Sequence, residues 1–372
     1  MGGGGFTLYY EVDRIFEEYL CTERSDAFVI GLLLYAMSHS TCEDPITMTC
    51  LAPLSSRLYY QLVVLLIPTI SKELKFYNSI NINCELDDRV INSKHAVATG
   101  VSGGVDSFYT LLKNKGENIP GFNITHGVYL EYKTEASSVD ELPLKLHELA
   151  ENICNELGVV FVNISSNIVK EVYRIAHEAI ITPMFTSYIF ALQKLFSIYY
   201  FSSGHPYSSF KICSHSSELY NLLYMHLLSS DNLSFYSTGS EALRHEKTEF
   251  ISNFELPRHY LNVCRNPYIE NGVLKNCSKC SKCTRTMIDL YLFGKLDLFR
   301  DIFDVDKFNR NKDYYLGYLV FKGKKDHYVS ETLEAFRKKK IKFPISARVA
   351  GLIKLLKNGF KRGNPLQYTY RP

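Results

Sequence analysis

The hydrophobic pattern of the chain changes near residue 93. Before that point, short β-rich runs alternate with apolar segments of helical period, which predicts a small α/β unit. After it, strand-like apolar runs are separated by longer helical patterns, as in βαβ units. Connections of that kind give parallel strands, so we expect an α/β fold with a doubly wound parallel sheet.

The second pattern is regular enough to place its elements. We expect strands at 95–101, 122–130, 159–164 and 197–203, and helices at 106–115, 142–157 and 180–196. Ligands of doubly wound sheets bind at the carboxyl ends of the strands. The preceding block, residues 1–92, carries no recognisable chemistry, which favours a scaffold or a homodimer interface.

The composition is typical of a globular protein. The chain has 372 residues, 46% of them apolar and 22% charged, enough for two or three domains at roughly 150 residues each. No apolar run approaches the ~18 residues of a membrane span. The opening MGGGGF matches neither a signal peptide nor a myristoylation motif, so we expect a cytoplasmic protein.

Basic residues concentrate near the C-terminal end. Residues 333–372 contain eleven Lys or Arg and one Glu, although the whole chain has a net charge of only +3, so the remaining body is acidic. The same region has a helical pattern with an apolar and a basic face. The apolar positions are Val349, Leu352, Ile353, Leu356 and Phe360, and the basic ones are Lys354, Lys357 and Lys361. Such a helix can dock on the acidic body, a protein partner, an anionic membrane or nucleic acid, and the sparse aromatic residues favour the first two.

A glycine loop follows the first strand of the parallel pattern. Its residues are Ser102, Gly103, Gly104, Val105, Asp106 and Ser107. A strand-to-helix turn presents unpaired backbone N–H groups and the positive end of a helix dipole, which together bind phosphate. The glycines let the backbone approach the anion, and the serines add hydroxyl donors. Asp106 can cap the helix and help to hold Mg²⁺.

The loop differs from two familiar nucleotide motifs. It lacks the Lys of a Walker A loop and the G-x-G-x-x-G of a dinucleotide fold, which disfavours kinases and hydride-transfer enzymes. The string S-G-G-x-D-S after an apolar strand instead resembles the PP-loop of the N-type ATP pyrophosphatases, also called adenine nucleotide α-hydrolase-like enzymes, at all five fixed positions. That resemblance implies ATP as a substrate, attack on its α-phosphate, and release of pyrophosphate from an adenylated product.

Four of the ten cysteines lie within twenty residues of one another. They are Cys264, Cys277, Cys280 and Cys283. The spacing C-x12-C-x2-C-x2-C lets four thiolates surround one ion, which predicts a closed, structural zinc site. Lys275, Lys279 and Lys282 would offset its negative charge. An iron–sulfur cluster or free thiols are the alternatives, and the clustering favours a metal in a reduced cytoplasm over disulfides.

The loop and the cysteines together resemble the 7-cyano-7-deazaguanine synthase (QueC) family and its wider QueC-like relatives. The resemblance spans residues 94–299 and includes Arg285 just behind the last cysteine. It implies a HUP-type nucleotide-binding sheet, ATP on the loop and zinc on the cysteines. The segment LRHEKTEFI is similar to a late stretch of the family, which implies that Arg244 and Lys247 act with Asp106 on the phosphates. Solvated charges on a helix are the alternative for the two cations.

The family activates a deazaguanine carboxylate with ATP, and ammonia then gives an amide that a second adenylation dehydrates to a nitrile. Its YGQRH and GYPDCR stretches have no counterpart here, where VYLEYKTEASS and SGHPYSSFKICS stand instead. The activated substrate is therefore a deazaguanine-like or another carboxylate or amide. The added N-terminal block and basic tail resemble larger QueC-like proteins of anti-phage operons or specialised biosynthetic clusters.

The expected function is an AMP-forming carbon–nitrogen ligase that joins the activated small molecule to a nitrogen nucleophile, which is itself a small molecule or a protein acceptor. A sulfurtransferase is the first alternative and would need an iron–sulfur cluster or a persulfide on a cysteine such as Cys213. A nucleotide-gated adaptor without turnover is the second. His126, His205 and His215 stand near strand ends, where a proton shuttle belongs, but surface or core positions explain them equally well.

We expect four parts along the chain. They are an accessory α/β domain at 1–92, an ATP-binding domain at 93–262, a zinc-binding segment with a helix at 263–300, and a basic helical extension at 301–372.

Overall fold

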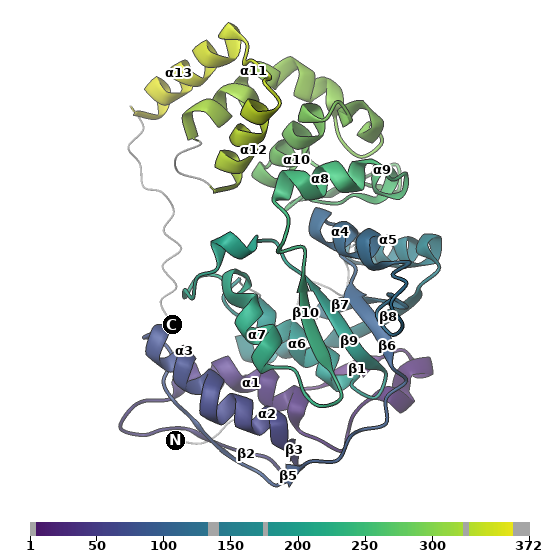
Figure 1. The fold of residues 1–372 in the computed structure, drawn as a ribbon, viewed down its shortest axis with the longest axis vertical. Coiled ribbons are helices and arrows are strands. Elements are labelled where there is room, and N and C mark those ends of the chain that lie inside the picture. The colour runs from purple at the N-terminus through teal and green to yellow at the C-terminus, as the bar shows by residue number, and fades with distance from the viewer. Residues whose placement is uncertain (1–4, 133–140, 174–177, 323–326, 360–372) are drawn as a thin grey trace. The chain divides into compact units, whose positions relative to one another are not determined.

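The computed structural model describes residues 5–132, 141–173, 178–322 and 327–359. Over these ranges the chain forms two compact units, Met1–Leu243 and Arg244–Pro372, with a sheet in the first and a set of helices in the second (Figure 1). None of the helices in these ranges has both the length and the apolar character that crossing a bilayer requires.

The first unit is built on a sheet whose strands run mostly parallel. Among the described residues, six strands follow the order β1-β8-β7-β6-β9-β10, and only β1 is antiparallel to its neighbour. The strands are β1 (Tyr10–Val12), β6 (Ala96–Gly100), β7 (His126–Tyr132), β8 (Val160–Ser166), β9 (Phe196–Ser202) and β10 (Ser234–Thr238). The prediction of an α/β fold with a mostly parallel sheet is confirmed. The chain runs outward from β6 to β8 and then crosses back to β9, so the strand order reverses between β6 and β9.

Helices cover both faces of this sheet (Figure 1). The helices of the unit are η1 (Arg14–Tyr19), α1 (Asp26–His39), α2 (Ser56–Tyr60), η2 (Gln61–Leu66), α3 (Ile67–Glu73), α4 (Val105–Asn114), α5 (Glu141–Leu157), η3 (Val169–Tyr173), α6 (Ile181–Ala191), η4 (Tyr207–Ser209), η5 (Ser217–Tyr220) and α7 (Asn221–Leu227). α5 packs one apolar stripe, which includes Leu149 and Ile153, against the sheet, and its opposite side faces solvent. α6 is buried nearly all round, since it packs against both the sheet and α1.

The N-terminal block shares the core of the parallel sheet. β1 pairs with β8 and forms one edge of the sheet, and the Tyr10 hydroxyl lies 2.8 Å from Ser187 Oγ on α6. A Cβ at Gly31 on α1 would lie 2.7 Å from that Tyr10 hydroxyl, so the close approach requires glycine. Further strands of the block form two short parallel pairs, β2 (Thr47–Thr49) with β4 (Asn81–Asn83) and β3 (Leu54–Ser55) with β5 (Leu86–Asp87). The expected boundary at residue 92 therefore runs through one continuous core.

The second unit combines helices with one hairpin. Its elements are α8 (Arg244–Ser252), α9 (Leu256–Tyr260), β11 (Tyr268–Glu270), β12 (Val273–Lys275), α10 (Ser281–Leu292), η6 (Leu296–Phe299), α11 (Val305–Lys322), α12 (His327–Lys338) and α13 (Ile345–Gly359). Asn271 and Gly272 join the two strands with φ angles of 52° and 76°. Two left-handed residues match the turn that suits the twist of a two-residue hairpin.

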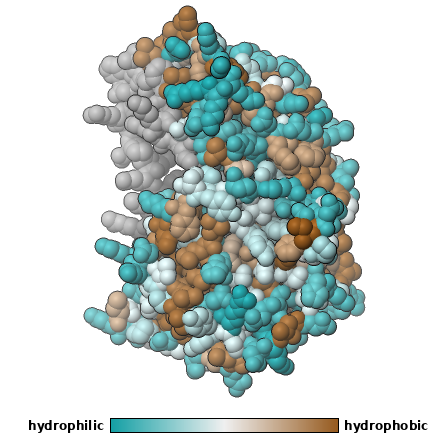
Figure 2. All heavy atoms as spheres, viewed as in Figure 1, coloured by the Kyte–Doolittle hydropathy of each residue, from teal (hydrophilic) through white to brown (hydrophobic). Residues whose placement is uncertain are grey.

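The C-terminal helix α13 approaches α11 through small residues. Gly317 on α11 approaches α13 so closely that a Cβ there would collide with the Ala347 carbonyl oxygen. The predicted apolar face stays outside: Val349, Leu352 and Ile353 are 50%, 50% and 47% exposed. Figure 2 shows hydrophobic side chains at the top of the view, where Figure 1 places α13. Phe360 and Lys361 lie outside the described residues, as do the side chains of Lys354, Leu356 and Lys357.

Candidate functional site

The glycine loop, residues 102–107, joins β6 to α4. Gly103 has a φ of +69°, a left-handed value that costs an L-residue with a side chain free energy. Gly104 is the N-cap of α4, and the helix begins at Val105. Because α4 begins just after the carboxyl end of β6, its first-turn N–H groups are directed toward that edge of the sheet. Gly104 has no side chain that could cap them. The loop therefore has the form of an anion-binding turn.

Ser107 fixes the shape of this loop from within. Its side chain is buried, its hydroxyl donates to the Gly100 carbonyl at 2.7 Å, and its oxygen accepts from the Ser102 N–H at 3.2 Å. The Gly104 N–H donates to Ser102 Oγ at 3.3 Å. The hydroxyl proton of Ser107, which we expected to point at phosphate, is thus used to hold the end of β6 against the start of α4.

A second loop end meets the glycine loop at the point where the strand order reverses. Gly204 follows β9, and a Cβ there would lie 4.0 Å from Asp106 Oδ2 and 3.4 Å from Glu218 Oε2. The carboxylates of Asp106 and Glu218 therefore both lie close to Gly204. Doubly wound sheets hold ligands at this edge, where the connections from two neighbouring strands leave in opposite directions. Our sequence reasoning missed Glu218, since only the topology brings it to residue 106.

Buried polar side chains tie the neighbouring strand ends together. Asn221 Nδ2 donates to Ser203 Oγ at 3.1 Å, and Ser237 Oγ donates to Asn221 Oδ1 at 3.3 Å. On the outer side, Glu241 accepts from the Tyr109 hydroxyl at 3.0 Å and forms an ion pair with Lys113 of α4. These bonds fix the loops after β9 and β10 relative to the helix that carries Asp106.

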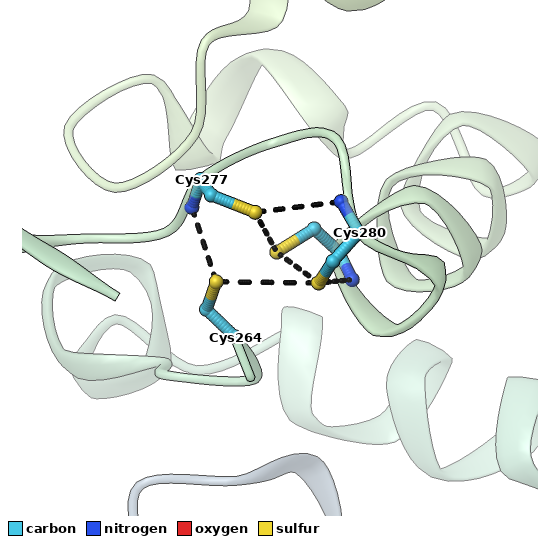
Figure 3. A group of neighbouring side chains, drawn as sticks. Cys264, Cys277 and Cys280 are labelled. Atoms are coloured by element: carbon cyan, nitrogen blue, oxygen red, sulfur yellow. Dashed lines mark hydrogen bonds between the residues drawn. The ribbon is translucent and has the colours of Figure 1, made fainter. Parts of the chain in front are cut away.

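The four cysteines of the second unit converge on one point. Their sulfur atoms all lie within 4.8 Å of one another. Cys264 Sγ is 4.0 Å from Cys280 Sγ, and Cys277 Sγ is 3.9 Å from Cys283 Sγ. Figure 3 shows the sulfurs of Cys264, Cys277 and Cys280 directed toward one another. Four thiolates around zinc at 2.3 Å would stand about 3.8 Å apart, so this group could hold a metal ion such as zinc.

Asn276 and Ser278 build the turn that carries the cysteines. The buried Asn276 side chain donates to the Leu261 carbonyl at 2.8 Å and accepts from the Val263 N–H at 2.9 Å. Ser278 has a φ of 55°, and its hydroxyl oxygen accepts from the Asp304 N–H at 2.9 Å. These contacts join the segment before Cys264 to the C-x2-C-x2-C turn, and neither residue was among the predicted site residues.

Backbone N–H groups surround the sulfurs. Burial alone would raise the pKa of Cys280, but hydrogen bonds from the N–H groups of Arg265 and Cys283 lower the pKa to about 6. Burial and the neighbouring Cys280 raise the pKa of Cys283. A thiolate this close to another thiol makes the second thiol harder to deprotonate, because two neighbouring negative charges repel each other. A divalent cation offsets that repulsion and allows all of its ligands to be deprotonated. The Lys275 ammonium, expected to offset thiolate charge, donates to the Asp301 carbonyl.

The predicted cations Arg244 and Lys247 lie on α8 of the second unit, where Lys247 is 1% exposed. The Arg285 guanidinium stacks 3.9 Å above the Tyr328 ring, so α10 and α12 are joined by a cation–π contact. Asp289 on α10 is fully buried and accepts from the Thr332 hydroxyl at 2.9 Å. Burial raises the pKa of Asp289 to about 7. The glycine loop belongs to the first unit, and the action of the two cations on phosphate stays a prediction.

The three histidines differ in their surroundings. His126 is half-buried at the start of β7; burial lowers its pKa to about 4, and its Nδ1 lies 2.8 Å from Thr125 Oγ1. His205 lies in the loop after β9. His215 is exposed, with Nε2 3.6 Å from Cys213 Sγ. His215 therefore contacts a nucleophilic side chain.

Comparison with known proteins returns no match for this chain, whether with family models, with curated proteins or with solved structures.

Proposed function

We propose that this chain is a QueC-like PP-loop enzyme with a HUP-type sheet, which uses ATP to adenylate a carboxylate or amide and transfers the activated group to a nitrogen nucleophile. The observation that carries the proposal is the S-G-G-x-D-S loop at the start of α4, beside the reversal of strand order. A loop of this form binds anionic phosphate and leaves the carboxyl edge of the sheet for the second substrate.

The residues around the loop are suited to stabilise pyrophosphate as a leaving group. The first-turn N–H groups of α4 and the helix dipole would bind its negative charge. Asp106 and Glu218, which both lie close to Gly204, would hold Mg²⁺ with the phosphates, and the ion would neutralise charge at the α-phosphate. On the sequence resemblance, Arg244 and Lys247 would stabilise the negative charge of the leaving group. None of these groups supplies a nucleophile, so the attacking oxygen comes from the acid or amide.

The cysteine cluster fits zinc in a structural role. Four thiolates complete a tetrahedral shell and leave no position open for a substrate. Zinc there would hold the β11–β12 hairpin to the start of α10 and would take no part in the chemistry. We therefore keep a cytoplasmic carbon–nitrogen ligase, with a role in anti-phage defence or specialised biosynthesis, ahead of the sulfurtransferase.

The proposal is tested with ATP labelled at the α- and γ-phosphates, ammonium, and a panel of acids that includes 7-carboxy-7-deazaguanine. We expect acid-dependent formation of AMP and pyrophosphate. Asp106→Asn should lower the rate at least ~100-fold because the metal and the first helical turn lose a carboxylate. Asp44→Asn, an exposed change elsewhere in the first unit, serves as the control.

Two results would contradict this assignment. Release of ADP and phosphate would place the attack at the γ-phosphate. Iron with labile sulfide in anaerobically purified protein would favour the sulfurtransferase.

A further inference from the structure

The loop between β9 and η5, residues 203–216, carries a cysteine and a histidine that the proposed ligase chemistry leaves without a role. The start of this loop lies beside the glycine loop, because Gly204 is close to Asp106, and Glu218, just after the end of the loop, lies close to Gly204 as well. The carboxyl edge of the sheet holds the reacting groups of such folds. Side chains of this loop are therefore candidates for the transfer step that follows activation.

Cys213 and His215 form a pair within the loop. Cys213 Sγ lies 3.6 Å from His215 Nε2, within the range of a hydrogen bond that involves sulfur. The Cys213 thiol also donates to the Ser216 carbonyl oxygen at 3.6 Å. Cys213 is 9% exposed, whereas His215 is on the surface. An imidazole in this position can take the thiol proton and pass it to solvent, which is how cysteine nucleophiles are activated.

A buried hydroxyl next to the pair lacks a partner. Ser216 is 2% exposed, and within the part of the chain that the structure describes its Oγ makes no hydrogen bond. Burying a hydroxyl without a partner costs free energy, so such groups are uncommon unless something else binds them. An acyl oxygen on Cys213 would supply an acceptor, since the Ser216 backbone already contacts that sulfur.

The segment behind the pair is anchored. The Ser217 N–H and hydroxyl both donate to the Glu178 carbonyl at 2.8 Å, and the Ser217 oxygen accepts from the Thr182 N–H at 3.1 Å. Thr182 belongs to the first turn of α6, which is buried against the sheet. A site held by a packed helix keeps its geometry better than a free loop does.

We propose that Cys213 is a second catalytic residue, which accepts the acyl group from the adenylate as a thioester, with His215 as its base; this step rests on the proposed function. The thiol proton moves to His215 Nε2, a C–S bond forms at the activated carbonyl, and the C–O bond to AMP breaks with AMP taking the electron pair. An amine then attacks the thioester carbonyl, a C–N bond forms and the C–S bond breaks. The thiolate is regenerated, and the amine proton leaves through His215.

The pair itself is tested without ATP or substrate. Iodoacetamide is added at neutral pH, and alkylation of each cysteine is followed by peptide mass spectrometry, with exposed Cys42 as the internal reference. We expect His215→Ala to slow alkylation of Cys213 roughly tenfold and to leave Cys42 unchanged. Equal Cys213 rates in the two proteins would overturn the role of His215.

The transfer step is tested in a single turnover with ATP and the acid panel. Without an amine, the wild-type Cys213 peptide should gain the mass of the acyl group, and hydroxylamine should remove it. Cys213→Ala should still form AMP and pyrophosphate in the first turnover but should form the amide at least ~100-fold more slowly. Half-buried Cys50→Ala is the control, and thermal unfolding shows whether each variant is folded.

The two proposals fail in different ways. Amide formation at the wild-type rate in Cys213→Ala would overturn the thioester while adenylation stands. No AMP from wild-type protein with any acid would contradict the proposed function and the transfer step together, whereas the iodoacetamide result would still decide whether His215 activates Cys213.

Discussion

The glycine loop and the four-cysteine cluster are each built on the start of a helix, but they use that start in opposite ways. At α4 the N-cap is Gly104, which has no side chain to accept from the first-turn N–H groups. At α10 the N-cap is Cys280, and its sulfur accepts from the Cys283 N–H. Both helix starts attract negative charge. At α10 that charge is carried by the sulfur of Cys280, whereas at α4 we propose that it comes from a bound anion.

This difference sets what each site depends on. The proposed phosphate binding of the glycine loop rests on its backbone, so it should be sensitive to any side chain that changes the φ of Gly103. The cysteine cluster acts through side chains whose thiolates repel one another without an ion, so it is sensitive to metal and to each sulfur. Ligand binding in the first case and folding in the second should fail when these dependences are disturbed.

The largest effect is expected from Cys283→Ser. Cys283 is fully buried, and structural zinc contributes about 10 kcal/mol or more to the folding of small domains. We expect loss of bound metal and rapid hydrogen exchange over 244–359, while the sheet of the first unit stays protected. Exposed Cys42→Ser should keep the metal and change stability by less than about 0.5 kcal/mol. Full metal content in Cys283→Ser would show that the four sulfurs do not act as one site.

The sequence predicted the four ligands but not the structure that brings them together. Spacing alone identifies cysteines that can share an ion, because the chemistry lies in the side chains. The β11–β12 hairpin was not among the expected elements, although Asn271-Gly272 is a strong hairpin signal. Asn276 had no such signal. Its role depends on Leu261 and Val263, which only the folded chain places beside it.

A second prediction concerns the buried carboxyl in the middle of α10. Burial raises the pKa of Asp289 to about 7, against about 3.9 for an unfolded chain. Between these values the native state holds a proton that the unfolded state has lost, so the free energy of unfolding falls as pH rises from about 4 to 7. Asp289→Asn should remove that fall and gain up to about 4 kcal/mol at neutral pH.

Urea unfolding of the metal-loaded protein between pH 5.5 and 8 measures this contribution as the difference between variant and wild type. Exposed Glu334→Gln is the control, since its surface pair with Lys338 contributes little. The same pH dependence in Asp289→Asn and wild type would contradict the assignment. If the pH effect of Asp289→Asn is confined to the second unit, the two sites differ further, because none of the six residues of the glycine loop has a fully buried carboxyl group.

The glycine loop was more fully predictable than its surroundings. Strand, loop and helix are contiguous, and the shape depends on glycines whose effect is local. Edge strand β1 was not predicted to join the main sheet, because a three-residue strand is decided by its partner β8 rather than by its own pattern. For α13, helical periodicity gave the apolar positions, but the small residues that allow close approach to Gly317 decided which face packs.

A third prediction separates strain from ligand binding in the loop. Gly103→Ala places an alanine at a φ of +69°, which costs about 1 kcal/mol and tilts the N–H groups away from phosphate. Gly121→Ala is a matched control, because Gly121 has a φ of +82° with no atom within 4 Å of the new Cβ. Both variants should lose similar stability. Only Gly103→Ala should weaken binding of a non-hydrolysable ATP analogue, by at least about tenfold, which corresponds to about 1.4 kcal/mol of binding free energy. Equal affinities by calorimetry would contradict the backbone model of the loop.

The smallest effect is expected from Ser107→Ala, which removes the hydroxyl that joins the Gly100 carbonyl to the Ser102 N–H. The loss should be about 1 kcal/mol of stability, with a several-fold loss of affinity for the ATP analogue because the loop is less well held. Ser229→Ala is the matched control. Ser229 is buried in the same unit, and its hydroxyl donates to the Met225 carbonyl at 2.7 Å and accepts from the Phe235 N–H at 3.0 Å. It should cost the same stability and leave nucleotide affinity unchanged. If Ser107→Ala lost affinity beyond ~100-fold, the hydroxyl would bind phosphate directly, and the loop would act through a side chain as the cysteine cluster does.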